Sequence, residues 1–287
     1  MSTIETPVHK SSFTIKAKLF AKIMDALHDI VDGWCMFKIG STGLSLRQMD
    51  VSHVSLVCVS FPLSSFEKFE TDEQEFYFGF NIVDFIKRMP KEKKNSMLNG
   101  NLTVSAESAR TSPVSFYLKQ KKIKREIYFQ LKNNPDDPDV IRIPPTPAWD
   151  NAIQIQQQLF LNNMQYLAQM CDVFCISTST SAVILQQVTT LPSISEADPL
   201  EIQLNFNGSM TLKFLRKETF AEYPTRHLHT LAKALSGWNE SLFLYQKEDV
   251  PLNILCEIGN GIVLNYYIAP KLSDDVSPPP LKRLKKN

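Results

Sequence analysis

The chain alternates between segments with the hydrophobic period of a helix and segments with the period of a strand. Four segments have the helical period: residues 19–31, 81–89, 162–171 and about 223–235. Gly33 follows the first as a stop signal, and Pro90 ends the second. In each segment the apolar positions fall on one side, so each is predicted to be a helix that packs on a core.

Short runs of alternating or β-branched residues lie between these helices. In chain order they are CMFKI, LSLRQM, VSLVCVSF, EFYFGF, NLTVSA, VSFYLK, REIYFQL, VFCIST, AVILQQV, EIQLNF, MTLKFL, LFLYQK, LNILCEI and IVLNYYIA. Each half of the chain therefore has the order helix, strands, helix, strands, with helix starts roughly 60–65 residues apart. This internal repeat predicts two similar α+β domains.

A proline-rich and acidic segment, NNPDDPDVIRIPPTPAWD at 133–150, separates the two halves. Its composition favours an extended connector, and its small apolar island around Ile141 and Ile143 is expected to pack on a neighbouring surface. The predicted organisation is a flexible leader, a first domain, the connector, a second domain and a disordered basic tail. Their bounds are 1–12, 13–132, 133–150, 151–272 and 273–287.

Composition narrows the class of protein. Of the 287 residues, 43% are hydrophobic and 21% are charged, which is ordinary for a folded soluble protein. The net charge of +1 argues against a surface that is basic all over, although basic charge gathered on one face remains possible. No apolar run reaches the length of a membrane span, so no membrane partner is expected. The five cysteines indicate buried thiols in a reducing compartment.

One short polar cluster invites a catalytic interpretation. Asp50, Ser52 and His53 could form a hydrolase site, but no nucleophile-elbow or glycine-rich loop surrounds them. We therefore favour a tight turn between two strands, with the hydrolase kept as a distant alternative. Cys171 and Cys175 lack further ligands at suitable spacing for a metal. No metal, cofactor or enzymatic activity is expected.

Basic residues recur on or next to three of the four predicted helices, away from the apolar stripes. They are Lys18, Lys22, Lys87, Arg88, Lys91, Arg226 and Lys233. On any single helix such residues indicate only a solvated face. If all four helices line one concave surface, the charges add up to a track for phosphates. The third helix carries none, which weakens this interpretation.

Two runs resemble one known family. GLSLRQMDVSHVSLVCVSF, residues 43–61, and DVPLNILCEIGNGIVLNYYIAPKL, residues 249–272, resemble conserved runs of the proliferating cell nuclear antigen family, the eukaryotic-type DNA sliding clamps. The chain resembles a divergent member of that family over roughly residues 13–272, because the two runs occur in the same order and at the same separation as in the family.

The resemblance implies a fold and a function. Two alike domains, each with two helices packed on antiparallel sheets, would be joined by the extended connector. Three subunits would close head to tail into a homotrimeric ring with the helices inside. The ring would encircle double-stranded DNA without reading its sequence, would be placed there by a clamp loader, and would tether DNA polymerase and other proteins with a clamp-binding motif. The implied location is the nucleus, or a viral replication site. The alternatives are a subunit of a heteromeric checkpoint clamp and a monomeric viral processivity factor.

The resemblance also implies site residues. Partner peptides would place an aliphatic and two aromatic side chains into a pocket formed by Met49, Val54, Leu56, Ile141, Ile143, Pro251, Tyr267 and Ala269. The subunit interface would be formed by Arg125, Ile127, Phe129 and Leu131 with Ile202 and Leu204 of a neighbour. Lys22, Lys87 and Lys233 fall on basic, DNA-facing positions of the family, whereas His28 replaces a lysine there.

Overall fold

A computed structural model gives the structure of the protein. It describes residues 10–31, 33–72, 75–89, 100–107, 114–120, 123–129, 148–188, 200–238 and 241–271. Lys91, Leu131, Ile141 and Ile143, most of the predicted connector and the predicted tail lie outside these residues.

The described residues contain four α-helices: α1 (Ala17–Ile30), α2 (Ile82–Arg88), α3 (Gln157–Met170) and α4 (Thr225–Ala234). Each was predicted, although α3 begins earlier than its apolar pattern indicates. The early start of α3 was missed because its first turn is glutamine-rich, even though Gln157 itself is buried. The Asn81 side chain caps α2 by accepting a hydrogen bond from the backbone N–H of Asp84 at 3.1 Å.

The first half of the chain forms strands β1 to β9. Their bounds are β1 (Lys10–Lys16), β2 (Trp34–Gly40), β3 (Gly43–Met49), β4 (Ser55–Pro62), β5 (Lys68–Thr71), β6 (Phe76–Asn81), β7 (Asn101–Glu107), β8 (Val114–Gln120) and β9 (Ile123–Phe129). Residues 10–12 of the expected leader therefore lie in a strand. The hydrophobic pattern contains no separate signal for β1, because its alternation runs directly into the helical pattern of α1.

The second half forms strands β10 to β18. Their bounds are β10 (Asn151–Gln156), β11 (Val173–Thr178), β12 (Ala182–Gln187), β13 (Glu201–Asn205), β14 (Met210–Leu215), β15 (Thr219–Pro224), β16 (Ser241–Gln246), β17 (Leu252–Gly259) and β18 (Ile262–Ile268). Besides β1, the strands β5, β10 and β15 were not predicted, since they are short or merge with a neighbouring pattern.

The two halves repeat one another element by element. In the first half, β1 pairs with β5 and β7, and β8 pairs with β7 and β9; in the second half, β10 pairs with β14 and β16, and β17 pairs with β16 and β18. The order β4-β3-β2-β6 likewise corresponds to β13-β12-β11-β15. All of these pairs are antiparallel. The predicted α+β fold of two similar halves is thus confirmed.

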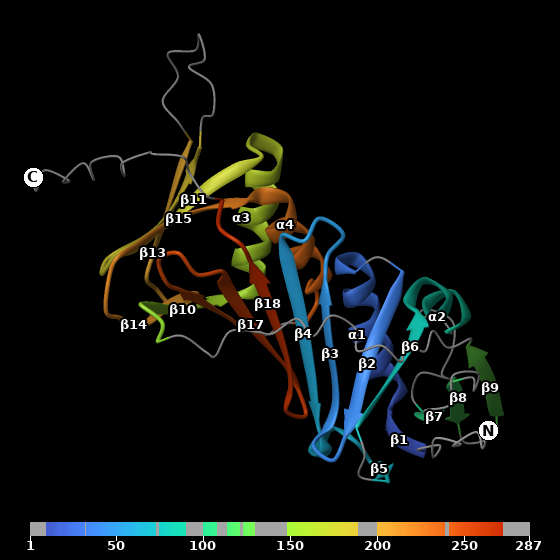
Figure 1. Ribbon diagram of the computed structural model, residues 1–287. Helices are drawn as coiled ribbons and strands as arrows, with labels where there is room; N and C mark the ends of the chain where they lie inside the picture. The colour runs from blue at the N-terminus through green and yellow to red at the C-terminus, as the bar shows by residue number, and fades with distance from the viewer. Residues whose placement is uncertain are drawn as a thin grey trace, which may run out of the picture.

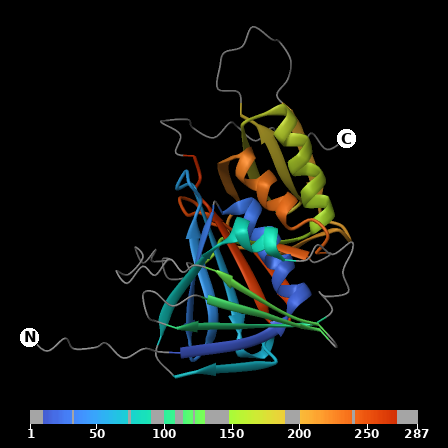
Figure 2. The same ribbon diagram turned by 90° about the vertical axis from the view of Figure 1, so that its right-hand side faces the viewer.

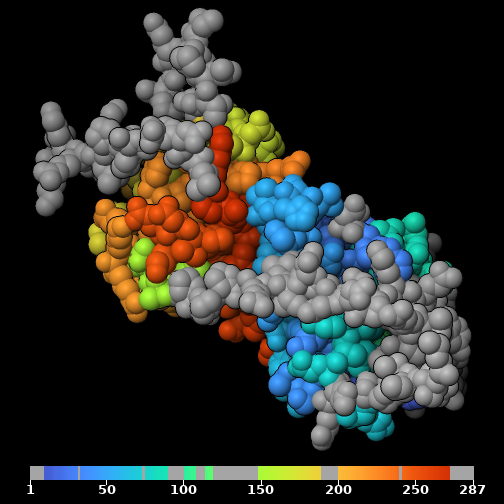
Figure 3. Space-filling model, viewed as in Figure 1, coloured from blue at the N-terminus to red at the C-terminus, as the bar shows by residue number. Residues whose placement is uncertain are grey.

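One strand pair joins the halves. β18 of the second half pairs with β4 of the first, from Val263 opposite Ser60 to Ile268 opposite Ser55. This pairing produces a continuous sheet of order β14-β10-β16-β17-β18-β4-β3-β2-β6. The junction is visible where the red strands meet the blue ones, in the ribbon view (Figure 1) and on the surface (Figure 3).

The helices form a layer on one side of the sheets. α1 packs between α2 and α4, and α4 packs on α3. Figure 2 shows the four helices next to one another, to the right of the blue strands of the long sheet. Phe20 of α1 lies near the rings of Phe85 and Phe116, at centroid distances of 5.7 and 6.5 Å, and so ties the helix layer to the core of the first half. The exposed faces of the helices therefore turn toward the same side of the molecule.

Candidate functional site

The basic side chains predicted to face DNA lie on the helix layer. Lys18 of α1, Lys87 and Arg88 of α2, and Arg226 and Lys233 of α4 are exposed. Because these helices share one face, their cations gather on one side of the molecule and can attract phosphates together. This arrangement fits the low net charge of the chain.

Lys22 differs from the other predicted DNA-facing residues. Its Nζ donates a hydrogen bond to the carbonyl oxygen of Gly237 at 2.9 Å and lies 4.1 Å from the centroid of the Trp238 ring. Gly237 and Trp238 follow α4, so Lys22 links the helix layers of the two halves. No local sequence pattern predicts this contact, because it joins residues far apart in the chain.

The exposed face of α3 is uncharged. The helix sequence QQLFLNNMQYLAQM contains no acidic or basic residue. Its exposed side chains are mainly glutamine and asparagine, together with Tyr166 at 45% and Met170 at 48% exposure. This helix can therefore offer amide hydrogen bonds and apolar contact, but no charge for phosphates.

Asp50 organises the turn between β3 and β4. Its Oδ1 accepts hydrogen bonds from the backbone N–H of Val54 at 2.9 Å and of Ser55 at 2.7 Å, and the Ser52 hydroxyl donates to its Oδ2. His53 has a φ of 57°, in the left-handed region that the turn requires, and its side chain is exposed. The cluster is therefore a turn closed by a carboxylate, as we predicted.

A histidine of the second half contacts the same carboxylate. Nδ1 of His227, on α4, lies 3.4 Å from Oδ2 of Asp50, and the two side chains are only 11% and 12% exposed. Burial raises the pKa of Asp50, but the hydrogen bonds from Ser52, Ser55 and Val54 and the charge of His227 outweigh it, and this pKa is lowered. Burial lowers the pKa of His227, against the influence of Asp50. At neutral pH the contact is therefore mainly one between a carboxylate and a neutral imidazole.

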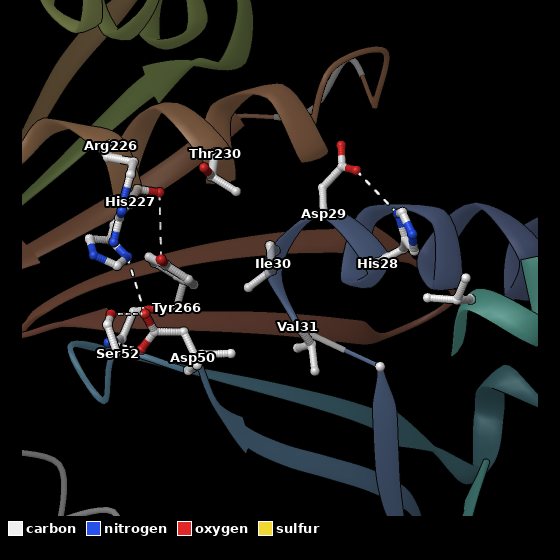
Figure 4. Close-up of a pocket in the computed structure, with 14 residues that line it drawn as sticks. His28, Asp29, Ile30, Val31, Asp50, Ser52, Arg226, His227, Thr230 and Tyr266 are labelled. Atoms are coloured by element: carbon white, nitrogen blue, oxygen red, sulfur yellow. Dashed lines mark hydrogen bonds and ion pairs between the residues drawn. The ribbon is translucent and has the colours of Figure 1, made fainter. Parts of the chain in front are cut away.

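The Asp50–His227 contact lies at a cavity of about 640 Å³ between the two halves. The ends of α1 and α4, the β3–β4 turn and Tyr266 of β18 line it, as Figure 4 shows. The Tyr266 hydroxyl donates to the carbonyl oxygen of His227 at 3.5 Å. The cavity therefore marks a polar junction between domains.

The geometry does not form a nucleophilic triad. A catalytic serine must be hydrogen-bonded to the base, and the base must be oriented by the acid. Here the Ser52 hydroxyl donates directly to Asp50, and the ring of His227, not of His53, is the imidazole that contacts this carboxylate. The arrangement leaves the serine without a base and favours a structural role.

The residues expected to form the peptide pocket lie on the face of the sheet that is opposite the helix layer. Met49 of β3, Leu56 of β4 and Tyr267 of β18 occupy successive paired positions, so their side chains project from the same face. All three are partly exposed. The Ala269 N–H donates to the carbonyl oxygen of Val54 at 3.0 Å, which brings two further expected pocket residues together across the halves. Pro251 is also partly exposed, just before β17.

The strands expected to join subunits lie at sheet edges. β9, which contains Arg125, Ile127 and Phe129, is the last strand of the order β5-β1-β7-β8-β9. β13, which contains Ile202 and Leu204, is the last strand of the order β13-β12-β11-β15. Ile202 and Leu204 pack partly against the core of their own half. Any contact through β13 would therefore use its backbone edge more than these side chains.

Other features of the described residues are their thiols, their potential metal ligands and the length of their helices. Burial raises the pKa of the Cys35, Cys58 and Cys175 thiols to about 12, as expected for inert buried thiols. No group of three or more potential metal ligands gathers in the described part of the chain. None of its helices is long and apolar enough to span a membrane.

Comparison with known proteins finds relatives that match most of the chain. The family described as "Proliferating cell nuclear antigen, N-terminal domain" matches residues 12–139. A proliferating cell nuclear antigen of Chaetomium thermophilum is 23% identical over 273 residues, which cover 91% of this chain and 97% of that protein. The chain is therefore similar to sliding clamps over most of its length.

Two further relatives show the breadth of the family. A DNA polymerase sliding clamp of Cenarchaeum symbiosum is 24% identical over 252 residues, covering 88% of this chain and 94% of that protein. Proliferating cell nuclear antigen 2 of Drosophila melanogaster is 25% identical over 257 residues, covering 89% and 95%. The similarity to eukaryotic and archaeal clamps extends over both halves of the chain.

Proposed function

We propose that this protein is a DNA sliding clamp: a homotrimeric ring that encircles duplex DNA and tethers DNA polymerase and other replication or repair proteins to it. The proposal rests on the β4–β18 pairing, because the pair that would correspond to it in the internal repeat is not formed within the described part of one chain. Within the internal repeat, β9 corresponds to β18 and β13 corresponds to β4. Yet β9 and β13 are edge strands in the described part of the chain.

An intermolecular β9–β13 pair would repeat the β4–β18 junction between subunits. Such a contact is heterologous, because each subunit uses two different surfaces, and it makes a closed ring if the rotation per subunit closes. Closure also protects both open edges from uncontrolled pairing. Three two-domain subunits would then form a ring of six similar domains with the helix layer inside.

The helix layer fits a ring that holds DNA by enclosing it more than by binding it tightly. Its exposed basic side chains can make sequence-independent phosphate contacts that salt screens. Weak contacts of this kind allow sliding, and the closed ring prevents dissociation. The role is non-enzymatic, which agrees with the structural use of the Asp50 turn.

The opposite face would bind clients. Met49, Leu56 and Tyr267 are partly exposed apolar or aromatic residues grouped across the junction of the halves. A surface of this kind suits apolar anchors of a client peptide. We propose that Ile141 and Ile143 of the connector complete the pocket, that a clamp loader places the ring on DNA, and that the protein acts in the nucleus.

The test measures the mass of the assembly and its retention on circular DNA. Light scattering of the purified protein should give one species at three times 32.7 kDa. After loading onto a nicked circular duplex, the protein should stay bound through a high-salt wash, and cutting the circle should release it. A stable monomer, a requirement for different partner subunits, or retention that does not depend on the circle would contradict the proposal.

A further inference from the structure

An apolar row continues from the proposed client pocket across the second half. In antiparallel sheets, directly paired residues project from the same face. Tyr267 is paired with Asn253, Asn253 with Tyr245, Tyr245 with Ala152, and Ala152 with Phe214. In the other direction Tyr267 is paired with Leu56, and Leu56 with Met49. We call the part made of Asn253, Tyr245, Ala152 and Phe214 the row extension.

Aromatic side chains gather along the row extension. The Tyr245 ring lies 5.8 Å from that of Trp149 and 6.5 Å from that of Phe243, centroid to centroid. All three are partly exposed, and Phe214 is 37% exposed. The guanidinium of Arg216, which is exposed, lies 5.6 Å from the centroid of the Phe214 ring. Rigid aromatic groups of this kind are the preferred anchors of protein interfaces.

A buried acceptor without a partner lies in the same row. Asn253, between Tyr245 and Tyr267, is 5% exposed. Its Nδ2 donates to Oδ1 of Asn265 at 3.3 Å, but its own Oδ1 is buried and accepts no hydrogen bond. Such an acceptor costs free energy unless a donor reaches it. The position of Asn253 thus points to a ligand with a polar N–H group.

We propose that the row extension is a second part of the client site, and that it binds an extended segment flanking the pocket-binding residues of the same client polypeptide. The segment would place an aromatic or large apolar side chain against Tyr245 and Phe214 and donate an N–H to Oδ1 of Asn253. The positive charge of Arg216 favours an acidic residue at the end of this segment that lies near β14. Four strand spacings separate β18 from β14, about 19 Å, which roughly six extended residues span. This inference rests on the proposed function, because it takes the pocket as its starting point.

Peptides of two lengths can test the extension. The core peptide carries only one aliphatic and two aromatic anchor residues, and the long peptides add six randomised residues at either end. After selection on the wild-type protein, long peptides should be enriched in aromatic or large apolar residues in one flank. They should bind about tenfold more tightly than the core peptide. This gain should fall to about twofold or less in Tyr245→Ser and Phe214→Ser and should also fall in Asn253→Leu, while core-peptide affinity stays within about twofold.

Phe220→Ser is the matched control. Phe220 is 38% exposed, almost the same as Phe214, but it lies on β15 in a different sheet. This variant should bind both peptides like the wild type. Phe214 is exposed, so its replacement should not destabilise the fold. Phe214→Ser can therefore test the extension even if Tyr245→Ser lowers the unfolding temperature.

Three results would overturn the extension. The first is long peptides without flank enrichment, the second is unchanged long-peptide affinity in Tyr245→Ser and Phe214→Ser, and the third is an equal loss for core and long peptides. If the core peptide does not bind the wild-type protein, the pocket itself is refuted, and the extension with it. Normal core binding with no flank effect refutes only the extension.

Discussion

At the residue scale, the polar cluster after β3 shows how a structural carboxylate can resemble a catalytic one. The Asp50 carboxylate accepts two backbone N–H groups and one hydroxyl, and it also contacts His227. These partners come from a turn and from the other half of the chain. The cluster therefore joins the two halves, since the Ser52 hydroxyl donates to the Asp50 carboxylate and not to an imidazole.

The left-handed backbone of His53 leads to a prediction about stability. His53→Gly should leave the free energy of unfolding within about 0.5 kcal/mol of the wild type, because glycine adopts positive φ without steric cost. His53→Val should lower it by about 1–2 kcal/mol, because a β-branched residue is strained there. Urea unfolding measures both. A large loss in the glycine variant would show that the His53 imidazole itself stabilises the turn.

The buried position of His227 predicts a dependence of stability on pH. Burial lowers its pKa in the folded protein from the ordinary 6.5, so the unfolded chain binds this proton more readily. The stabilising contribution is therefore complete above pH 6.5 and is lost as the pH falls through the folded-state pKa. Asp50, whose pKa is lowered from 3.8, adds a similar loss only in more acidic solution.

Urea unfolding at pH 7.5 and 5.5 checks the contribution of His227. The wild-type protein should be less stable at pH 5.5, and His227→Gln should reduce the difference between the two values. His229→Gln, on the same helix, serves as the control for the loss of a histidine and should keep the wild-type difference. Equal pH dependence in the wild type and His227→Gln would contradict the assignment.

At the scale of elements, α3 and α4 have different surface chemistry although they belong to the same domain. α4 carries the exposed Arg226 and Lys233, whereas α3 carries no charge. The proposed DNA track should therefore be interrupted once in every subunit. Contacts from glutamine and asparagine add hydrogen bonds but release no counterions, so they should make binding less dependent on salt.

Charge added to α3 should strengthen DNA binding and its dependence on salt. Gln165→Lys with Gln169→Lys, both at exposed positions, should steepen the slope of log K against log salt by up to about 0.9 for each new phosphate contact. Lys233→Gln should make the slope shallower. Fluorescence anisotropy with a short duplex at several salt concentrations measures the slope.

The control for α3 is Thr211→Lys, an added lysine at an exposed position of β14. It should leave the slope nearly unchanged, because the added charge lies away from the helix layer. An equal effect of Thr211→Lys and of the α3 variants would mean that net charge, and not a track along the helices, governs binding.

At the scale of the whole molecule, the decisive feature is a repeat that leaves two edges open. The β4–β18 junction uses one end of each half, and the corresponding strands β13 and β9 are left at sheet edges in the described residues. The proposed ring pairs these two edges between subunits. Enclosure would then hold DNA although the chain has a net charge of only +1.

The edge strand β9 predicts the effect of charge on assembly. Ile127→Lys with Phe129→Lys should raise the concentration at which the trimer dissociates at least about tenfold, because lysines on an edge strand disfavour pairing. Sedimentation or light scattering across a dilution series measures it. Glu70→Lys, on the β5 edge of the same sheet, should not change the assembly. Loss of the trimer in both variants would argue against β9 as the interface.

Much of the fold could be predicted because its signals are local. The four helices have clear apolar stripes, and Asn81 and Pro90 mark the ends of α2. The missed strand β5 has only four residues, and β1 and β10 continue directly into α1 and α3. Propensity within a few residues cannot separate such elements, since their identity depends on the strands with which they pair.

The sequence by itself determined the four helices, most of the strands, their repetition in two halves and the two runs that resemble sliding clamps, because hydrophobic period and turn chemistry act over a few neighbouring residues. Only the tertiary structure decided that Lys22 fastens α1 to the end of α4, that His227 meets Asp50, and that the aromatic residues of β14 and β16 continue a row that begins at Tyr267. These contacts depend on how strands pair across the two halves. Turns and hydrophobic pattern set the register within a hairpin, but these contacts join residues far apart in the chain, so no single local stretch of sequence encodes them.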